Sequence, residues 1–462
     1  MQLASLAALA GIAIHYLCFY LFAWPLLPEA IAEWIMARTP SHYALWILDA
    51  LGPWAKPSAV TGGLATLGAV LWVARWRWWA GVAAALGLTW FLAFSSIPAS
   101  LSFWLPAAAV LYAGARPSQA VPAAGRRRFV LAGVMAAGTV SVALESFFRD
   151  RIAAATSVKP VALFSFEPPP EREPFLPPLV RKAVTPVSEF YGMSKNTVDP
   201  VIDPATWRLR ITVDGRPLRD FRYQELLALP REQRYVSLRC ISNTLQSNLM
   251  GTALWSGVRL SQLVDPSKLP AGIVEAALIG VDGHGDSFPL DYAFGEETLF
   301  ALGMNGETLN RTHGFPIRLL VPRYYGFKHV KWIDEIRFVS QPYYGTWPKL
   351  GYTKDPAIHT VCYIDRVRRA GNAIEAGGIA FAGSRGIRRV QVRADNGDWL
   401  EAACEQPLSA YTWTRWRVVI PVMNVTLVHA RAMDGAGRWQ SEVETPLFPN
   451  GVAGPTVRKV SL

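Results

Sequence analysis

The sequence is short of cysteine, of common catalytic motifs and of charge. Its 462 residues include four cysteines, too few and too scattered for a disulfide framework or a CxxC metal site. No GxGxxG, P-loop, GxSxG or HExxH motif is present, so the commonest signatures of nucleotide, hydrolase and zinc sites are missing. Charged residues make up 18% of the chain, below the roughly 25% of a typical soluble domain. These absences exclude a disulfide-rich miniprotein and a single uniform soluble domain.

Charge is scarcest in the first 115 residues, which hold seven charged residues but ten of the 18 tryptophans. Residues 1–150 contain five apolar runs, at 3–27, 57–74, 129–144 and, split by a Ser-Ser-Ile-Pro turn, twice within 80–115. Such runs are typical of membrane spans. We therefore expect an all-α transmembrane bundle of about five helices in the cell inner (cytoplasmic) membrane, surrounded by lipid. A buried helical core is the alternative.

Basic residues predict the orientation of this bundle. Arg75, Arg77, Arg116 and residues 126–128 flank the runs on the side that the positive-inside rule assigns to the cytoplasm. Everything after Leu144 then faces the periplasm or the cell exterior. The net charge of +11 is not concentrated on one element, so no nucleic-acid partner is expected.

The fifth run has a second interpretation. Residues 126–131 (RRRFVL) resemble a twin-arginine export signal, an address for proteins that are exported already folded around a cofactor. Simple positive-inside flanking is the alternative, and the sequence leaves open whether the chain is cleaved after this run. Only His15 lies within an expected span, and a transmembrane haem uses two axial histidines, so no haem is predicted.

The remainder of the chain has ordinary charge and divides into three parts. Residues 151–186 are rich in proline and predict an extended tether. Residues 187–365 alternate between expected strands and one short helix, and they form the expected catalytic domain. Residues 366–462 carry short strands separated by turns such as Asn396-Gly397, the pattern of a small β-sandwich. The strands expected in these two parts lie at 207–213, 236–240, 276–281, 317–321, 330–339, 379–381, 389–393, 417–421 and 426–432, and the helix at 223–229.

Three clusters of residues can carry chemistry. Cys240 lies at the end of an expected strand, where a lone cysteine is more often a small core residue. His313 and Arg318 stand at the two ends of the motif HGFPIR, and Lys331 belongs to the motif YGFKHVKW at 325–332. Arginine and lysine near a close-approaching glycine suit an anionic phosphate. A solvated basic turn is the alternative.

Together these motifs resemble the sulfite oxidase family of molybdenum-cofactor enzymes, from Phe190 to the C-terminus. Further matching stretches are DPATWRL at 203–209, WSGV at 255–258 and MNGE at 304–307. The resemblance implies an α+β sulfite-oxidase-type molybdopterin domain followed by an immunoglobulin-like β-sandwich, similar to the family's dimerisation domain. It also implies a homodimer formed through the C-terminal domain.

The resemblance implies a role for each matching position. Cys240 corresponds to the thiolate that binds molybdenum, and a soft sulfur ligand suits such a metal. Tyr352 corresponds to the active-site tyrosine near the metal-bound oxygens. The implied contacts to the molybdenum–molybdopterin cofactor are Tyr191, Gly192, Asn196, Asp282, His313, Arg318, His329, Val330 and Lys331.

The sequence also departs from the family pattern. Sulfite oxidases carry an arginine on the substrate side of the N-terminal motif, where this chain has Ser194 and then Lys195, which could supply the positive charge from a shifted position. The haem domain of the animal enzymes is missing, so electrons must pass to or from a separate partner, a cytochrome c or the quinone pool. The expected function is oxygen-atom transfer, with oxidation of sulfite or a related small sulfur compound first. A sulfoxide or other oxo-substrate reductase fed by quinol, and a cofactor-free membrane receptor or scaffold, are the alternatives.

Overall fold

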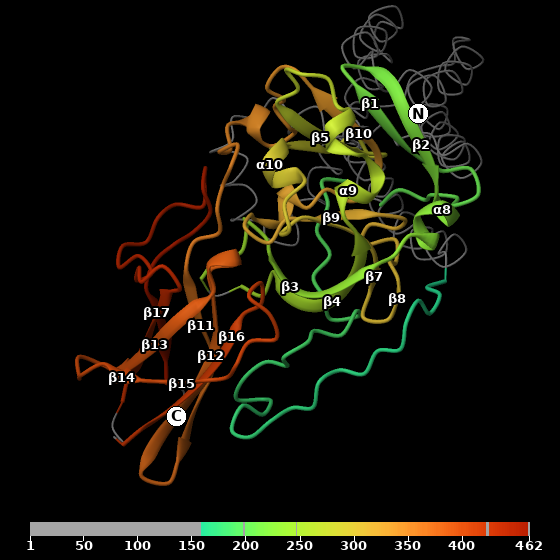
Figure 1. Cartoon of the computed structure of the whole chain (residues 1–462). Coiled ribbons are helices and arrows are strands. Elements are labelled where there is room, and N and C mark those ends of the chain that lie inside the picture. The colour runs from blue at the N-terminus through green and yellow to red at the C-terminus, as the bar shows by residue number, and fades with distance from the viewer. Residues whose placement is uncertain (1–158, 197–198, 246, 422–424, 461–462) are drawn as a thin grey trace, which may run out of the picture. The chain divides into compact units, whose positions relative to one another are not determined.

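The computed structural model of the chain describes residues 159–460, except for residues 197–198, 246 and 422–424 (Figure 1). The expected transmembrane bundle and the twin-arginine-like segment lie outside the described residues. Within the described part of the chain, no helix is long and apolar enough to cross a membrane.

The catalytic domain contains two sheets of five strands each. In the first, the order is β2-β1-β10-β5-β6, and only β1 and β10 pair in parallel. Its strands are β1 (Arg208–Val213), β2 (Arg216–Arg222), β5 (Glu275–Gly280), β6 (Gly285–Pro289) and β10 (Ile333–Val339). In the second, the order is β3-β4-β7-β8, with β9 also paired to β7. Its strands are β3 (Glu232–Arg239), β4 (Met250–Val258), β7 (Leu299–Met304), β8 (Glu307–Thr308) and β9 (Arg318–Leu320).

Helices in the described part of the catalytic domain are short. The α-helices are α8 (Tyr223–Ala228), α9 (Leu260–Leu263) and α10 (Leu290–Ala293). The 3₁₀ turns are η2 (Pro266–Lys268), η3 (Gly326–Lys328) and η4 (Pro348–Leu350). The expected α+β domain is therefore rich in β-structure, and its described helices are only a few residues long.

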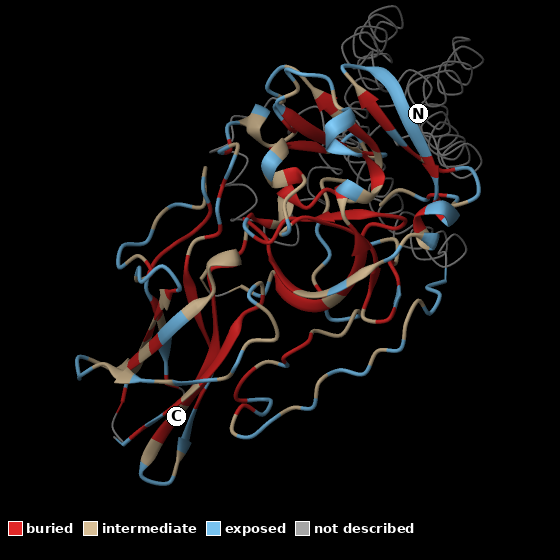
Figure 2. Ribbon diagram, viewed as in Figure 1, coloured by how far each residue is buried: buried red, intermediate tan, exposed pale blue. Residues whose placement is uncertain are grey.

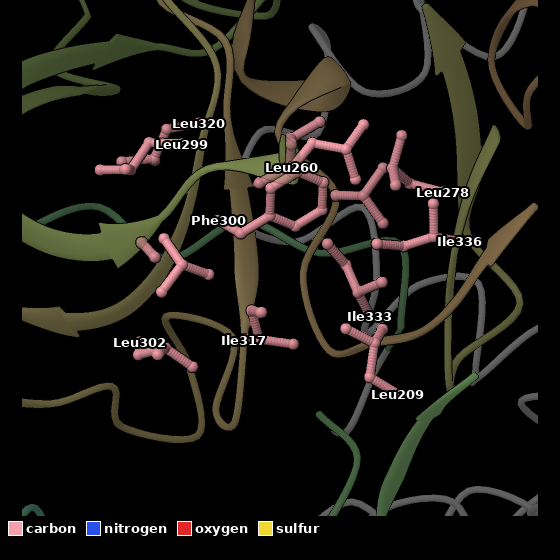
Figure 3. Packing of buried hydrophobic residues seen from close by; sticks show 14 of the residues in the cluster. Leu209, Leu260, Leu278, Leu299, Phe300, Leu302, Ile317, Leu320, Ile333 and Ile336 are labelled. Carbon is pink, nitrogen blue, oxygen red and sulfur yellow. The ribbon is translucent and has the colours of Figure 1, made fainter. Parts of the chain in front are cut away.

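The core of this domain lies between the two sheets, where Figure 3 shows Leu278 and Ile336 from one sheet near Phe300 from the other. Strand β7 is buried along its whole length, and β4 along all but one residue (Figure 2). The sequence reading did not detect these two strands, although it detected β5 and β9, which are also buried.

The predicted strand at 330–339 begins three residues late, at Ile333. The preceding segment forms the turn η3, and Trp332 has a left-handed backbone with a φ of 56°. The apolar alternation continues through residues 330–332, but the backbone turns there and does not yet form a strand.

The C-terminal domain is a β-sandwich of two four-stranded sheets. One has the order β11-β12-β16-β15 and the other β14-β13-β17-β18. The strands are β11 (Val361–Ala370), β12 (Ala373–Phe381), β13 (Ile387–Ala394), β14 (Leu400–Glu401), β15 (Ala403–Cys404), β16 (Thr414–Ile420), β17 (Leu427–Asp434) and β18 (Thr456–Lys459), with the 3₁₀ turn η5 (Gly383–Arg385). Ile374 and Trp416 from the first sheet share one buried cluster with Val392 and Val428 from the second. The first strand, β11, begins within the range 187–365 that the sequence assigns to the catalytic domain.

Residues 159–186, here named the strap, are the described part of the predicted extended tether. The strap has little regular structure, but it packs on both domains (Figure 1). Ala162 forms an isolated bridge to Glu307 in β8, and Arg181 forms hydrogen bonds and an ion pair with Asp365 in β11. Apolar side chains between the prolines, Phe175, Leu179, Val180, Ala183 and Val184, are buried. Composition alone indicates an extended chain, but it does not show that this segment packs on the surfaces of the two domains.

Candidate active site

Cys240 follows the last residue of β3 and is only 6% exposed. The turn that carries it is closed by a hydrogen bond of 3.1 Å from the Asn243 amide to the Cys240 carbonyl. Gly326 lies against it, since a Cβ at that position would come within 3.4 Å of Cys240 Cα and 2.8 Å of Tyr191 Oη. Only glycine allows the motif YGFKHVKW to approach the cysteine this closely.

The Cys240 side chain is a protonated thiol in this setting. Burial raises the pKa of the thiol, and the opposing effects of hydrogen bonds from Ser242 and of the Arg239 charge are smaller. A bound soft metal ion would displace this proton, because the thiolate is the form that coordinates metals.

Two tyrosine hydroxyls lie near the thiol. Burial, and then the neighbouring Cys240, raises the pKa of Tyr352 to about 12. The pKa of Tyr191 is also raised, by burial first and Cys240 second, while Arg318 acts in the opposite direction. Both hydroxyls are therefore protonated at neutral pH, and each can donate a hydrogen bond toward a group bound at Cys240.

On the Tyr191 side the site is cationic. Arg318 is 5% exposed, donates from Nη1 to the His313 carbonyl at 3.1 Å, and has a buried Nε without a hydrogen-bond partner. Burial lowers the pKa of Arg318 to about 10, so the guanidinium stays charged at neutral pH. Lys331 Nζ donates to the Thr312 carbonyl at 2.8 Å, and Gly314, at a φ of 105°, lies against the side chains of both cations. A buried cation with an unused donor is the environment that an anionic phosphate needs.

Both histidines on this side are neutral. Burial, and then the Arg318 charge, lowers the pKa of His313 to about 4 and that of His329 to about 3. The His329 ring lies 3.1 Å from the Tyr324 carbonyl through Nε2 and 3.3 Å from the Val321 amide through Nδ1. The Val330 carbonyl accepts from the Leu319 amide at 2.8 Å. These groups therefore serve the fold of the segment, and contacts from His329 and Val330 to a cofactor remain predictions.

The predicted cofactor contacts nearest the N-terminus include Asn196 and Gly192, and Asn196 is connected to turn η3 through hydrogen bonds. Asn196 Nδ2 donates to Asp282 Oδ2 at 2.9 Å, and Asp282 Oδ1 accepts from the His284 amide at 3.0 Å. His284 Nε2 lies 2.9 Å from the Phe327 carbonyl, which joins this pair to turn η3. Gly192 packs against Thr312, where a Cβ would meet the Thr312 methyl group at 2.6 Å.

In the described part of the chain, no contact of Lys195 with the other predicted residues tests its expected role. Lys195 is half-buried, and no hydrogen bond or ion pair within the described residues involves it. Its role as a substrate-side cation therefore remains a prediction.

Sequence reasoning missed three residues of the site. His284 has a buried Nδ1 without a partner, a second unused polar group beside the segment. Lys328 is fully buried and pairs with the equally buried Asp286 at 2.8 Å, which holds turn η3 in place. Arg239 is fully buried immediately before Cys240. The only sequence signal for Lys328 and Arg239 was their position inside motifs that match the family. No sequence signal indicated His284.

On the Tyr352 side the site is aromatic. The Tyr352 ring centroid lies 5.1 Å from that of Phe448, 5.7 Å from that of Trp347 and 6.0 Å from that of Phe327. These residues come from η3, from the loop before η4 and from the segment after β17, so the aromatic side is assembled from both domains.

Several known proteins resemble this chain in sequence or in fold. Residues 196–347 match the family model described as "Oxidoreductase molybdopterin binding domain". Sulfite oxidase of Arabidopsis thaliana is 27% identical over 366 residues, which cover 65% of this chain and 91% of that enzyme. An uncharacterised oxidoreductase of Bacillus subtilis, YuiH, is 30% identical over 156 residues, covering 32% of this chain and 74% of that protein. In fold, the chain resembles the sulfane dehydrogenase SoxCD from Paracoccus pantotrophus, with a TM-score of 0.51, 20% identity, and coverage of 60% of this chain and 81% of that one.

Fold and site together define a molybdopterin-dependent oxidoreductase. The chain belongs to the sulfite oxidase family. Its cofactor is molybdenum–molybdopterin, and the residues present fit that group: a buried thiol suits the metal, and the unused donor of Arg318 suits an anion. Family membership also sets aside the alternative of a cofactor-free receptor.

Proposed function

We propose that this protein transfers an oxygen atom between water and a small sulfur compound, with oxidation of sulfite or a related compound as the leading reaction. In that direction the sulfur compound gains one oxygen atom from water, and two protons and two electrons leave. The bound cofactor supplies this two-electron chemistry. The observation that carries the proposal is the buried thiol of Cys240 with the protonated hydroxyls of Tyr191 and Tyr352 near it.

The residues around Cys240 would have different roles in this reaction. Cys240 would ligate the metal, and Arg318 with Lys331 would hold the cofactor's phosphate. Tyr352 would donate a hydrogen bond to the oxygen that is transferred, which stabilises charge as it develops there. The relatives named for sulfite and sulfane substrates support a sulfur compound as the substrate.

Reduction of an uncharged sulfoxide is the second candidate, and one observation favours it. Phe327, Trp347 and Phe448 surround Tyr352, and an aromatic lining suits an apolar thioether or sulfoxide better than a hydrated anion. A sulfite anion would need a cation on this side, and Lys195 is the residue proposed for that task.

A paired assay on purified, molybdenum-loaded protein tests both candidates. Sulfite oxidation is followed with a dye as electron acceptor, and sulfoxide reduction with reduced viologen as electron donor. We expect turnover in the first assay and its loss in Cys240→Ser, with the exposed Cys404→Ser as the matched control. Turnover only with viologen and sulfoxide would replace the leading reaction by the second candidate. Failure of the purified protein to bind molybdenum would contradict both.

We further propose that residues 1–150 anchor the enzyme in the inner membrane, with the catalytic and sandwich domains on the periplasmic or outer face. The charge-poor runs and their flanking arginines support this arrangement. A cytochrome c or the quinone pool would exchange electrons with the site. Carbonate-resistant membrane association, and digestion of the catalytic domain by protease added outside spheroplasts, are the expected results. Release by carbonate would contradict the anchor.

We also propose a homodimer formed through the β-sandwich. Its support is the two-sheet domain at the C-terminus, at the position of the family's dimerisation domain. Light scattering of the detergent-solubilised enzyme should give twice the chain mass of 50.9 kDa after subtraction of detergent. A single chain mass would overturn this proposal.

A further inference from the structure

The guanidinium of Arg239 is a buried charge whose hydrogen bonds reach no carboxylate. Nη1 donates to Tyr325 Oη at 2.9 Å, Nε to Tyr363 Oη at 3.2 Å, and Nη2 to the carbonyls of Asn243 and Val452 at 3.2 Å each. All four acceptors are neutral, and the side chain is 0% exposed. Arginine stays protonated in proteins, so this is a full positive charge in the interior.

Another buried arginine of the same chain has the carboxylate partners that Arg239 lacks. Arg415, in β16, is 2% exposed and forms ion pairs with Glu171 of the strap and with Glu405. Two carboxylates therefore balance that guanidinium, whereas no ion pair of the described residues includes Arg239. Removing a charge from water is costly unless an opposite charge is close, so an uncompensated buried arginine indicates an anionic partner other than the protein's own carboxylates.

The position of Arg239 indicates which anion this is. Arg239 immediately precedes Cys240, and its Nη2 binds the Asn243 carbonyl while the Asn243 amide closes the turn on the Cys240 carbonyl. The guanidinium thus holds the turn that presents the thiol. Tyr363 lies in β11 and Val452 between β17 and β18, so the same guanidinium connects this turn to the sandwich domain.

We propose that Arg239 is the counter-charge of the anionic metal centre at Cys240, a positioning residue that stabilises the thiolate-bound cofactor and favours its reduced form. Arg318 and Lys331 face the proposed phosphate of the cofactor, whereas Arg239 acts on its metal end through the Cys240 turn. A fixed positive charge near a redox centre favours the state that carries the additional electron. The proposal rests on Cys240 as the metal ligand, as in the proposed function.

The test compares Arg239→Met, Arg239→Lys and the control Arg415→Met in the full-length protein. Molybdenum content, the midpoint potential from an EPR-monitored titration, and the melting temperature with and without cofactor are measured for each. In Arg239→Met we expect at least about tenfold weaker retention of molybdenum, a lower midpoint potential and a smaller gain in melting temperature on cofactor binding. Arg415→Met should lower both melting temperatures equally and leave the potential unchanged.

Arg239→Lys separates charge from shape. Lysine keeps the positive charge but cannot make all four hydrogen bonds, so we expect a lower melting temperature with a potential close to that of the wild type. If Arg239→Met does not fold, this variant decides alone, and a shifted potential in it would overturn the proposal. Arg239→Met that retains molybdenum at the wild-type potential would also overturn it. Wild-type protein without molybdenum would contradict the proposed function instead, so the two failures are distinguishable.

Discussion

The two sides of Cys240 are built from opposite kinds of residue. On the Tyr191 side, Arg318 is buried with an unused donor, and His313 is a neutral ring beside it. On the Tyr352 side, the ring is surrounded by aromatic side chains, among them Phe448 at 5.1 Å. One side suits a permanently bound anion, because an arginine cannot discard its charge. The other suits a small molecule that enters and leaves.

Cys240 joins the two sides, and its loss is expected to have the largest effect. Changes in the surroundings of a metal ligand already cost 10- to 100-fold, so Cys240→Ser should lower turnover by at least about 100-fold. Turnover per molybdenum atom is the measurement, with Cys404→Ser as the control. Turnover of Cys240→Ser equal to that of the wild type would show that the thiol is not the metal ligand.

The hydroxyl on the aromatic side is tested next. Tyr352→Phe keeps the ring and its packing but removes the donor, and loss of one such donor should lower kcat by about 100-fold with little change in molybdenum content. Tyr344→Phe, at an exposed ring, is the matched control. If Tyr352→Phe instead loses the cofactor, the tyrosine belongs to the cofactor side.

The cationic side is expected to act on the cofactor rather than on turnover. Arg318→Ala removes a charge-assisted hydrogen bond, so retention of molybdopterin should fall roughly 10- to 100-fold. Pterin fluorescence after denaturation gives the content, and Arg368→Ala, at an exposed ion pair in the sandwich, is the control. Full pterin content with an altered KM would place Arg318 on the substrate side.

The character of the aromatic side can be altered directly. Phe448→Arg introduces a cation next to Tyr352, and one new charge-assisted contact should lower the KM for sulfite by about tenfold. The KM for an uncharged sulfoxide should not fall. Phe448→Leu, which stays apolar, is the control. Equal changes for both substrates would show that charge on this side does not select the substrate.

The smallest expected effect is a pH dependence of stability on the cationic side. Burial, and then the Arg318 charge, lowers the pKa of His313 to about 4, whereas an unfolded histidine titrates near 6.5. Below that value the unfolded chain binds a proton that the folded chain does not bind. Cofactor-free protein should therefore lose about 1 kcal/mol of unfolding free energy from this group between pH 6.5 and about 5.5. Urea unfolding at the two pH values measures it, and an unchanged difference in His313→Gln would contradict the assignment.

The strap and the aromatic side show why part of the structure could not be read from the sequence. Proline content correctly describes residues 159–186 as irregular, but burial of Phe175 and Leu179 depends on surfaces formed by distant strands. The aromatic side likewise combines Phe327 with Phe448, which no local pattern connects. Strand β4 was missed because it shows neither alternation nor a continuous apolar run, since glycine, threonine and serine interrupt its apolar residues.

The chemistry of the individual motifs could be read directly from the residues. The order of motifs around Cys240, HGFPIR and YGFKHVKW indicated the family, its cofactor and the thiol, because each motif is a continuous stretch with its own residue types. The balance of the buried charges, in contrast, depends on packing. Arg239 and Arg415 are the same residue type in two strand segments, yet one meets two carboxylates and the other only neutral oxygens. Burial and partners arise from packing between elements that are remote in the chain, and they give identical side chains different roles.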